Sequence, residues 1–476
     1  MGKLTSNYTF VLIYQFILIL TPIFTTPYIS RVLGSGNLGI DAYVFSIVQV
    51  FQVFLTLGIG LHGKKQMAST VGKKAIQIQF SNIYSVQLVT SILVLSLYIV
   101  YVSQVQEYRS IFWGYTPMIV AAGLDVAWYF IGLEKIKQVM IRNIFVRIFS
   151  IILIFLFVNN DTDLWKFVLI NSLSLFMGQI INWIILIKEV KKFNFSIAGL
   201  KSNLRPILIL AIIPCVSLIY ISINKIVLGI VVGEIEVGFY NQAYKIIVMC
   251  MVFLSALSTV MMPRMVHLYS IGEEEKFKEM IEVSINYTFL TTLPLIGIII
   301  VLADSFVPFY LGNEFSSVIN LLKILTPAIL LQGLSYIFGL QILIVIGSNN
   351  TYAISIVLGA IVSIITNFLI VTRFNSIGTA ISYDVSILIT LLVQVYYSRV
   401  FVSLKRILYS FLKYSLFTIS MVLVLISTKN SQSQNFIFLF IEILIAMITY
   451  IILLFISRDV FLFKIIDKIF KKRIEY

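Results

Sequence analysis

The stretch NIYSVQLVTSILVLSLYIVYVSQ, residues 82–104, contains no charged side chain. It is long enough for one helical crossing, because about 20 helical residues span the roughly 30 Å hydrocarbon core of a bilayer. Lys73 and Lys74 precede it and a polar break at 104–112 follows. Across all 476 residues, 59% are apolar, only 12% are charged, and mean hydropathy is +1.01. A soluble domain could not bury so much apolar surface, so the sequence predicts an all-α integral membrane protein.

Stretches of this kind recur along the chain, and about fourteen of them are expected to cross the membrane. We expect spans at 8–30, 39–61, 82–104, 113–133, 144–158, 165–187, 207–232, 239–262, 282–303, 318–345, 352–372, 377–397, 410–427 and 435–457. The fifth is short and is expected to begin before Arg147.

Lysine and arginine clusters follow every second span, which sets the expected orientation. Placing these clusters inside puts both termini of a multi-pass membrane protein in the cytoplasm. The net charge of +14 is then mainly a topology signal. No basic soluble domain remains that could bind nucleic acid.

Two segments of the chain resemble each other. TPIFTTPYISRVLG (21–34) and IPCVSLIYISINKIVLG (213–229) share a proline, Tyr-Ile-Ser, a cation and a glycine, and Gly39 and Gly238 follow them. Both copies begin a span that leaves the cytoplasm. The chain is therefore expected to form two pseudo-symmetric six-helix bundles related by an axis along the membrane normal, with a cavity between them and alternating access by rocking.

This repeat divides the chain into five parts. We expect an N-terminal six-helix bundle at 1–190, a cytoplasmic basic linker at 191–206 and a C-terminal six-helix bundle at 207–400. Transmembrane helices 13 and 14 occupy 401–457. The remaining 458–476 are predicted to form an amphipathic helix on the anionic inner surface.

Three cations in the spans are candidates for binding an anionic head group such as a diphosphate: Arg31, Lys225 and Lys245. Charges inside a bilayer are costly and usually face a partner or a watery cavity. The guanidinium group of arginine also suits such oxygens, because it donates hydrogen bonds in a planar fork. The alternative is that these cations pair with acids as structural bridges, or extend to the outer surface.

The remaining polar residues of interest in the spans are acids and amides. Asp41, Asp125 and Asp384 are predicted to serve either ion coupling or structure. Candidate sugar contacts are Gln49, Asn224, Asn241 and Tyr244. For each of these the alternative is an ordinary interhelical hydrogen bond.

Neither a metal site nor a cofactor site is expected. Cys215 and Cys250 are single residues in different spans, without metal-ligand spacing. His62 and His267 lie far apart in sequence and are expected in solvated cytoplasmic loops.

The stretch GLDVAWYFIGLEK (123–135) resembles the fourth helix of bacterial lipid-linked oligosaccharide flippases. These form the polysaccharide-transporter family of the multidrug/oligosaccharidyl-lipid/polysaccharide exporter superfamily. Segments 27–34 and 225–245 resemble the first and the seventh-to-eighth helices of that family. One departure is Asn224, where the family often has an acid before the lysine. A charge pair in this span could then be absent, which would leave Lys225 more available to an anion.

The resemblance implies that the chain moves undecaprenyl-diphosphate-linked repeat units from the cytoplasmic to the outer leaflet. Such units feed capsular, exopolysaccharide or related cell-surface polymers. The partners would be this lipid-linked oligosaccharide, the bilayer, and the polymerase and glycosyltransferases of the same pathway. Asp125 and Asp384 would be the candidates for proton or sodium coupling.

Two alternatives stay open. A multidrug or cation exporter of the same superfamily would share the architecture, but it should favour acids over the cations found here. A polysaccharide polymerase or polyprenyl-sugar glycosyltransferase could use the outer Asp161-x-Asp163 for metal. Such enzymes need a large outer domain, and no segment of this chain is long enough for one. We therefore expect a transporter rather than an enzyme, with Asp161 and Asp163 solvating a loop.

Overall fold

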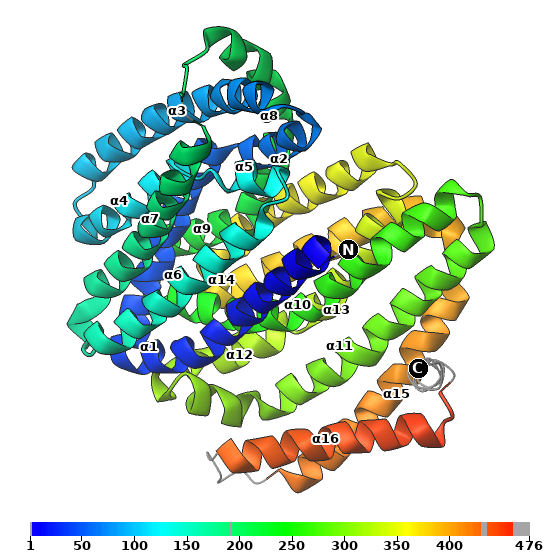
Figure 1. The fold of residues 1–476 in the computed structure, drawn as a ribbon. Coiled ribbons are helices and arrows are strands. Elements are labelled where there is room, and N and C mark those ends of the chain that lie inside the picture. The colour runs from blue at the N-terminus through cyan, green and yellow to red at the C-terminus, as the bar shows by residue number, and fades with distance from the viewer. Residues whose placement is uncertain (1, 191, 430–435, 460–476) are drawn as a thin grey trace. The chain divides into compact units, whose positions relative to one another are not determined.

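The computed structural model describes residues 2–190, 192–429 and 436–459, and within these ranges every regular element is helical (Figure 1). Eleven helices in the described residues are long and apolar enough to cross a membrane. The expected all-α membrane architecture is confirmed. The chain divides into two compact units, Met1–Gly238 and Phe239–Tyr476.

The first unit holds nine helices and the start of a tenth among its described residues. They are α1 (Gly2–Thr56), α2 (Ile59–Ser69), α3 (Lys73–Gln104), α4 (Arg109–Gly123), α5 (Ala127–Gly132), α6 (Ile136–Phe157), α7 (Leu164–Glu189), α8 (Ile197–Leu218), α9 (Asn224–Val231) and α10 (Glu234–Ser270). A 3₁₀ turn, η1 (Asp161–Asp163), precedes α7, and a π-helix, η2 (Ile219–Ile223), joins α8 to α9.

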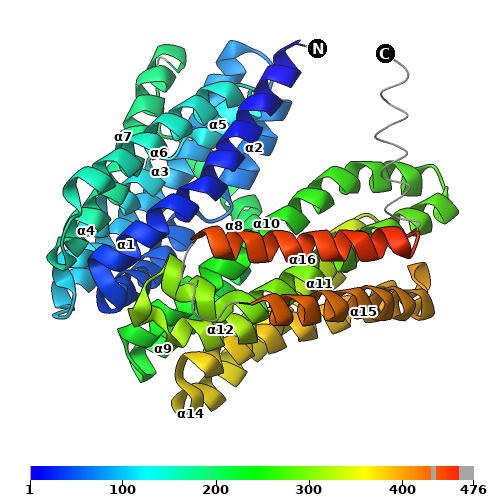
Figure 2. The ribbon, with the colours of Figure 1, turned by 90° about the horizontal axis from the view of Figure 1, so that it is seen from below.

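The second unit continues α10 from Phe239 and contains the remaining helices. They are α11 (Glu274–Tyr310), η3 (Asn313–Phe315), α12 (Ser317–Leu325), α13 (Pro327–Ser335), the π-helix η4 (Tyr336–Leu343), α14 (Asn349–Ser398), η5 (Arg399–Phe401), α15 (Leu404–Thr428) and α16 (Phe436–Ile456). Helices α11, α15 and α16 lie side by side (Figure 2). Their shared core includes Phe277, Phe289, Tyr414 and Met421.

Helix α14 contains two expected spans, and α1 contains the first expected span and most of the second. In α1 the break is at Gly34, whose φ of 74° lies in the left-handed region that glycine enters at little cost. In α14 the break is at Asn375, with a φ of 51°. Asparagine tolerates this region better than most residues. Two of the eleven long helices hold two expected spans each, and the other nine hold one each. The remaining expected span, the eighth, lies in α10, so all fourteen expected spans fall on helices of the structure.

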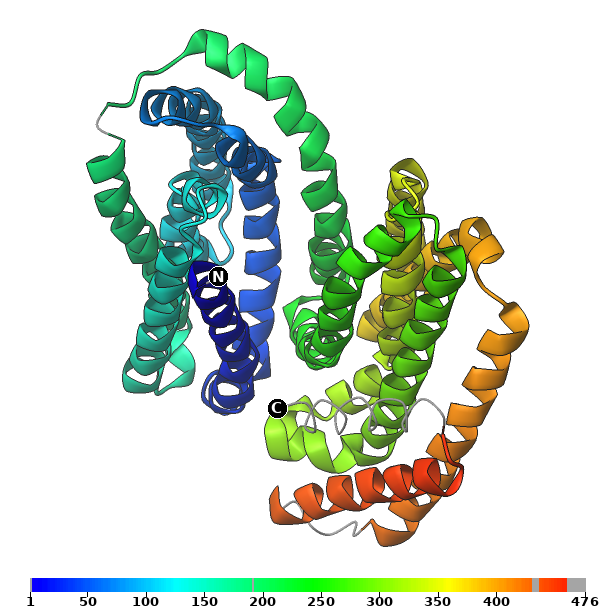
Figure 3. The ribbon, with the colours of Figure 1, turned by 45° about the vertical axis from the view of Figure 1, so that its right-hand side comes forward.

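The expected linker is partly helical, because α8 begins at Ile197, within 191–206. Figure 3 shows the chain leaving α7 and turning to reach α8, which packs beside α3. Helices α8 and α9, which form the seventh expected span, belong to the first compact unit. The predicted amphipathic tail lies outside the described residues from 460 onward.

Candidate functional site

The fourth span is broken between α4 and α5, and Gln87 of α3 stabilises the break. Its side-chain amide donates to the backbone carbonyls of Gly123 at 2.9 Å and Asp125 at 2.8 Å. Its oxygen accepts from the Trp128 indole N–H at 3.0 Å. Non-helical backbone at membrane depth persists only where its polar groups are satisfied. Buried Gln87 therefore makes this break possible.

The segment 123–135, which carries the family resemblance, packs mainly against its own unit. The Tyr129 hydroxyl donates to Glu189 at 3.1 Å, and the Lys135 ammonium pairs with the same carboxylate at 2.5 Å. Gly63 of α2 lies against the Trp128 ring, where a Cβ would be 2.5 Å from Cε3. These contacts give the motif a structural role in fastening the broken span to α2, α3 and α7.

Two of the predicted acids bridge helices of the first unit. Asp125 accepts hydrogen bonds from the Ala127 backbone N–H at 2.9 Å and the Gln179 amide at 3.3 Å, so it contacts the first residue of α5 and helix α7. Asp41 of α1 accepts from the Tyr115 hydroxyl of α4 at 2.5 Å. Of the two roles predicted for these acids, their contacts favour the structural one.

The predicted cation Lys225 lies on α9, directly after the π-helix η2. It is 6% exposed, and neighbouring Asn224 is fully buried. Single-turn π segments inside helices occur often at functional positions. A buried cation within an apolar span is also a functional signature, because desolvating it is expensive. Lys225 is thus a buried charge within an apolar span, and it interacts with other groups of the chain.

The elements around Lys225 pack closely on α1. The Ser222 hydroxyl donates to the predicted sugar contact Gln49 at 2.7 Å. Gly229 lies beneath the Tyr43 ring, where a Cβ would be 2.2 Å from Cδ2. In this structure Gln49 therefore contributes a hydrogen bond between α1 and η2, the alternative stated for the amides.

The other two predicted cations are exposed within their own units. Arg31 lies on α1, in the first unit, and Lys245 lies on α10, in the second. Each makes a polar or electrostatic interaction with other groups of the chain. Of the three cations, Lys225 alone is buried.

In the second unit, aromatic and amide residues of α10 meet α14. The rings of Tyr240 and Tyr244 stack with centroids 6.0 Å apart, and Tyr383 meets Tyr244 edge-on at 5.3 Å. Asn241, on the same helix, is buried. Of the predicted sugar contacts, Tyr244 belongs to this tyrosine cluster and Asn241 lies on the same helix. The other two rings of the cluster, Tyr240 and Tyr383, are not among the predicted sugar contacts. Tyr383 could have been noticed from its position next to Asp384.

Asp384 differs from the other two acids. Its Oδ1 atom is buried and has no hydrogen-bond partner in the described part of the chain. Tyr240 Oη and Gln242 Oε1, in the same unit, are also buried without a hydrogen-bond partner among the described residues. Buried polar atoms without partners are rare in native proteins, and each requires a physical explanation.

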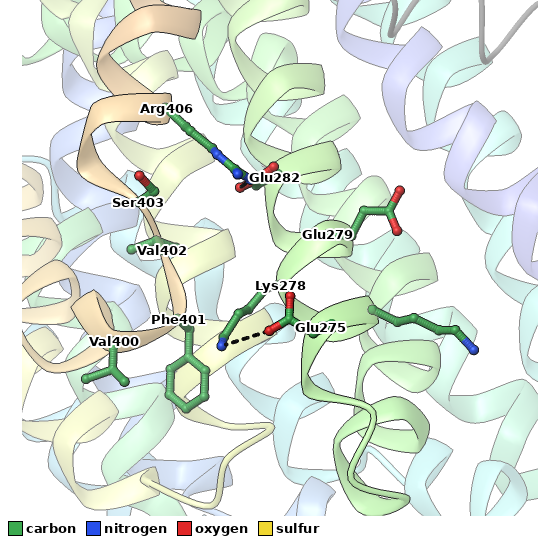
Figure 4. A pocket seen from close by; sticks show the side chains of 10 residues that line it. Glu275, Lys278, Glu279, Glu282, Val400, Phe401, Val402, Ser403 and Arg406 are labelled. Atoms are coloured by element: carbon green, nitrogen blue, oxygen red, sulfur yellow. Dashed lines mark hydrogen bonds and ion pairs between the residues drawn. The ribbon is translucent and has the colours of Figure 1, made fainter.

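A pocket of about 490 Å³ opens in the second unit, between the start of α11 and the segment joining α14 to α15 (Figure 4). Its charges are mostly paired: Arg406 with Glu282 at 2.6 Å, and Lys278 with Glu275 at 3.5 Å. None of the predicted site residues lines it. This pocket is therefore not part of the predicted site.

His62 is not solvated, contrary to the expectation. It lies in α2, is 4% exposed, and its Nε2 is 2.7 Å from the Asn203 amide oxygen of α8. No pattern in the sequence indicated that α8 would cover this position. The described residues contain no cluster of three histidine, cysteine or acidic side chains suited to a metal.

The outer Asp161-x-Asp163 pair also has a structural explanation. Asp163 accepts from the backbone N–H groups of Asn159 at 2.9 Å and Asn160 at 3.1 Å, and pairs with Lys166 at 2.6 Å. Both of its oxygens are engaged. These contacts make Asp163 a cap of the turn before α7 rather than a solvating loop residue.

Comparison with known proteins gives consistent matches. Residues 4–269, more than half of the chain, match the family model described as polysaccharide biosynthesis protein. A candidate O-antigen transporter of Escherichia coli (strain K12) is 25% identical over 391 residues, which cover 80% of this chain and 93% of that protein.

Solved structures share the fold. The lipid II flippase MurJ, in an inward closed conformation, superposes with a TM-score of 0.77 at 18% identity, covering 95% of this chain and 99% of that chain. An inward-facing multidrug resistance transporter of the MATE family, in the MOP superfamily, has a TM-score of 0.62 at 15% identity, covering 82% and 95%. At these identities the likeness establishes the fold.

Proposed function

Because the chain belongs to the polysaccharide biosynthesis protein family, we propose that it is a flippase for lipid-linked oligosaccharides. It moves undecaprenyl-diphosphate-linked repeat units from the cytoplasmic to the outer leaflet of the bacterial inner membrane. The units feed capsular, exopolysaccharide or related cell-surface polymers. The polymerase and glycosyltransferases that use and supply these units are its pathway partners.

The observation that carries the proposal is Lys225, a 6% exposed cation inside an apolar helix of a chain from this family. Charged side chains inside membrane spans are rare and usually mark substrate or ion pathways, which favours a functional role for Lys225. An anionic diphosphate is the substrate group that such a cation would bind. Arg31 and Lys245 add further positive charge on α1 and α10.

The sugar part of the substrate needs hydrogen bonds and flat apolar surfaces. Asn224 and Asn241 provide amides, and the tyrosine cluster at Tyr244 provides aromatic faces. The diphosphate and sugars cannot cross hydrocarbon unaided, whereas the polyprenyl tail can remain in lipid. A path lined by cations, amides and aromatic rings would therefore carry only the head group.

Among the three acids, we propose Asp384 as the ion-coupling residue. Asp41 and Asp125 each accept a hydrogen bond from a neighbouring helix or turn, whereas Asp384 Oδ1 has no hydrogen-bond partner in the described residues. Binding a proton or a sodium ion would satisfy this oxygen. Coupled ion movement would then bias alternating access by the two repeats.

The test is transport by the purified chain in vesicles. Fluorescent undecaprenyl-diphosphate oligosaccharide is placed in both leaflets, and its accessibility to an external quencher is followed under imposed proton or sodium gradients. We expect quenching beyond that of protein-free vesicles, with a gradient-dependent rate. Transport of cationic dyes without movement of the lipid-linked sugar would support the multidrug exporter instead.

A further inference from the structure

Two helices of the first unit cross at glycines. A Cβ on Gly39 of α1 would lie 2.1 Å from the carbonyl oxygen of Glu234, at the start of α10. A Cβ on Gly238 of α10 would lie 2.9 Å from the carbonyl oxygen of Ser35 and 2.9 Å from Gly39 Cα. All the obstructing atoms are backbone, so no side-chain rotation could make room. At this point the two backbones are in direct contact.

The contact is reciprocal with respect to the internal repeat. The repeat that pairs Gly34 with Gly229 has four extra residues in its second copy. When LGSGNLG (33–39) and VGEIEVG (232–238) are matched on their final glycines, Gly39 pairs with Gly238 and Ser35 with Glu234. Gly39 meets the carbonyl of Glu234, and Gly238 meets the carbonyl of Ser35. Each contacting glycine therefore meets the backbone of the other sequence repeat.

A glycine with positive φ precedes the contact in both copies. Gly34 and Gly233, each five residues before the contacting glycine, have φ values of 74° and 124°. Each begins a helix that contains the contacting glycine five positions later, and the apolar residue before that glycine is buried in both copies. A glycine with positive φ, followed five residues later by a close backbone contact, therefore occurs once in each repeat.

Further contacts extend this junction along α1. Tyr43 covers Gly229, and Gln49 accepts from Ser222 at 2.7 Å. In the predicted topology Gly39 and Gly238 lie at the outer ends of their spans, and Gln49 lies deeper. Helix α1 thus contacts η2, α9 and the start of α10, from the predicted outer surface inward.

We propose that the reciprocal contact between Gly39 and Gly238 is the outer seal of the transport path and separates in each cycle. This inference rests on the proposed function, since a flippase must open toward the outer leaflet. At the glycines themselves, bare backbone lets the two helices meet closely and part without repacking side chains. The Tyr43–Gly229 contact and the Ser222–Gln49 hydrogen bond would open with them. Gly39 and Gly238 are required because any side chain would hold the seal open.

The experiment measures the distance across the seal. Cys215 and Cys250 are replaced by serine, and spin labels are attached at Gly36→Cys and Ile235→Cys. These are equivalent positions on either side of the contact; a Cβ on Gly36 would meet nothing within 4 Å, and Ile235 is exposed. Pulsed electron spin resonance is recorded in lipid nanodiscs with and without an undecaprenyl-diphosphate disaccharide.

We expect two distances in the parent protein, with the disaccharide changing their ratio. Gly39→Ala should lower the ratio of short to long distance about tenfold or more, because overpacking against fixed backbone is costly. Gly238→Ala should act in the same direction with a smaller effect, and it carries the test if Gly39→Ala does not fold. Gly60→Ala is the matched control, because a Cβ there meets nothing within 4 Å.

A single short distance in the parent under both conditions would overturn the proposal, as would distributions in both glycine variants equal to that of Gly60→Ala. Flipping by the unlabelled chain is measured in parallel. Absence of flipping together with two distances would refute the proposed function while leaving the seal supported. Flipping together with one invariant distance would refute the seal alone.

Discussion

Replacing Gln87 by alanine tests whether the broken fourth span depends on this one side chain. The substitution removes three hydrogen bonds, which leaves the carbonyls of Gly123 and Asp125 and the Trp128 indole without this partner. Interhelical hydrogen bonds in membrane proteins are worth about 0.6–1.7 kcal/mol each. The three together predict a loss of about 2–5 kcal/mol in the free energy of unfolding.

The assay is reversible unfolding of the purified protein in mixed micelles, followed by tryptophan fluorescence, since Trp128 reports on the break directly. Gln77→Ala is the matched control on the same helix. The Gln77 side chain makes one exposed hydrogen bond, to the Lys192 carbonyl at 2.9 Å, and its loss should cost under about 1 kcal/mol. Equal stability of the two variants would refute the argument that Gln87 holds the break.

Three further predictions concern transport and the outer loop. Lys225→Met should reduce flipping at least about tenfold while helical content by circular dichroism stays unchanged. Unaltered flipping would show that Lys225 does not bind the head group. The control is Lys323→Met, which removes an exposed ion pair with Asp304. Asp384→Asn should make the flipping rate insensitive to proton and sodium gradients, and a gradient response equal to that of the parent would exclude it as the coupling acid. Asp163→Ala should lower the free energy of unfolding by about 1–2 kcal/mol, as loss of a helix cap does, without changing flipping; loss of flipping at unchanged stability would contradict its structural role.

The membrane fold could be predicted because each span is an apolar window set off by charged or polar residues. The breaks in α1 and α14 lie within a few residues of the expected ends of spans, since Gly34 and Asn375 separate the windows. The break at 124–126 could not be predicted in the same way. Its cause is a set of hydrogen bonds from Gln87 and Gln179, which lie far away in the sequence.

The sequence could nominate candidate site residues but not their contacts. Lys225 could be singled out from the sequence because lysine is rare inside an apolar span, and the structure places it among the buried residues. Whether an acid accepts a hydrogen bond does depend on neighbours, so the different surroundings of Asp125 and Asp384 became visible only in the structure. Gly39 and Gly238 were recognised as repeat partners, yet their mutual contact joins positions about 200 residues apart, which pattern alone does not reveal.

The most direct test of a cation-lined path for an anionic head group compares two lipids that differ only in charge. Vesicles containing the purified chain receive the same fluorescent oligosaccharide linked to undecaprenol through a diphosphate or through an uncharged ether. Rapid flipping of the diphosphate form, lost in Lys225→Met, with slow flipping of the ether form, is the predicted result. Equal rates for both lipids, unaffected by Lys225→Met, would contradict it.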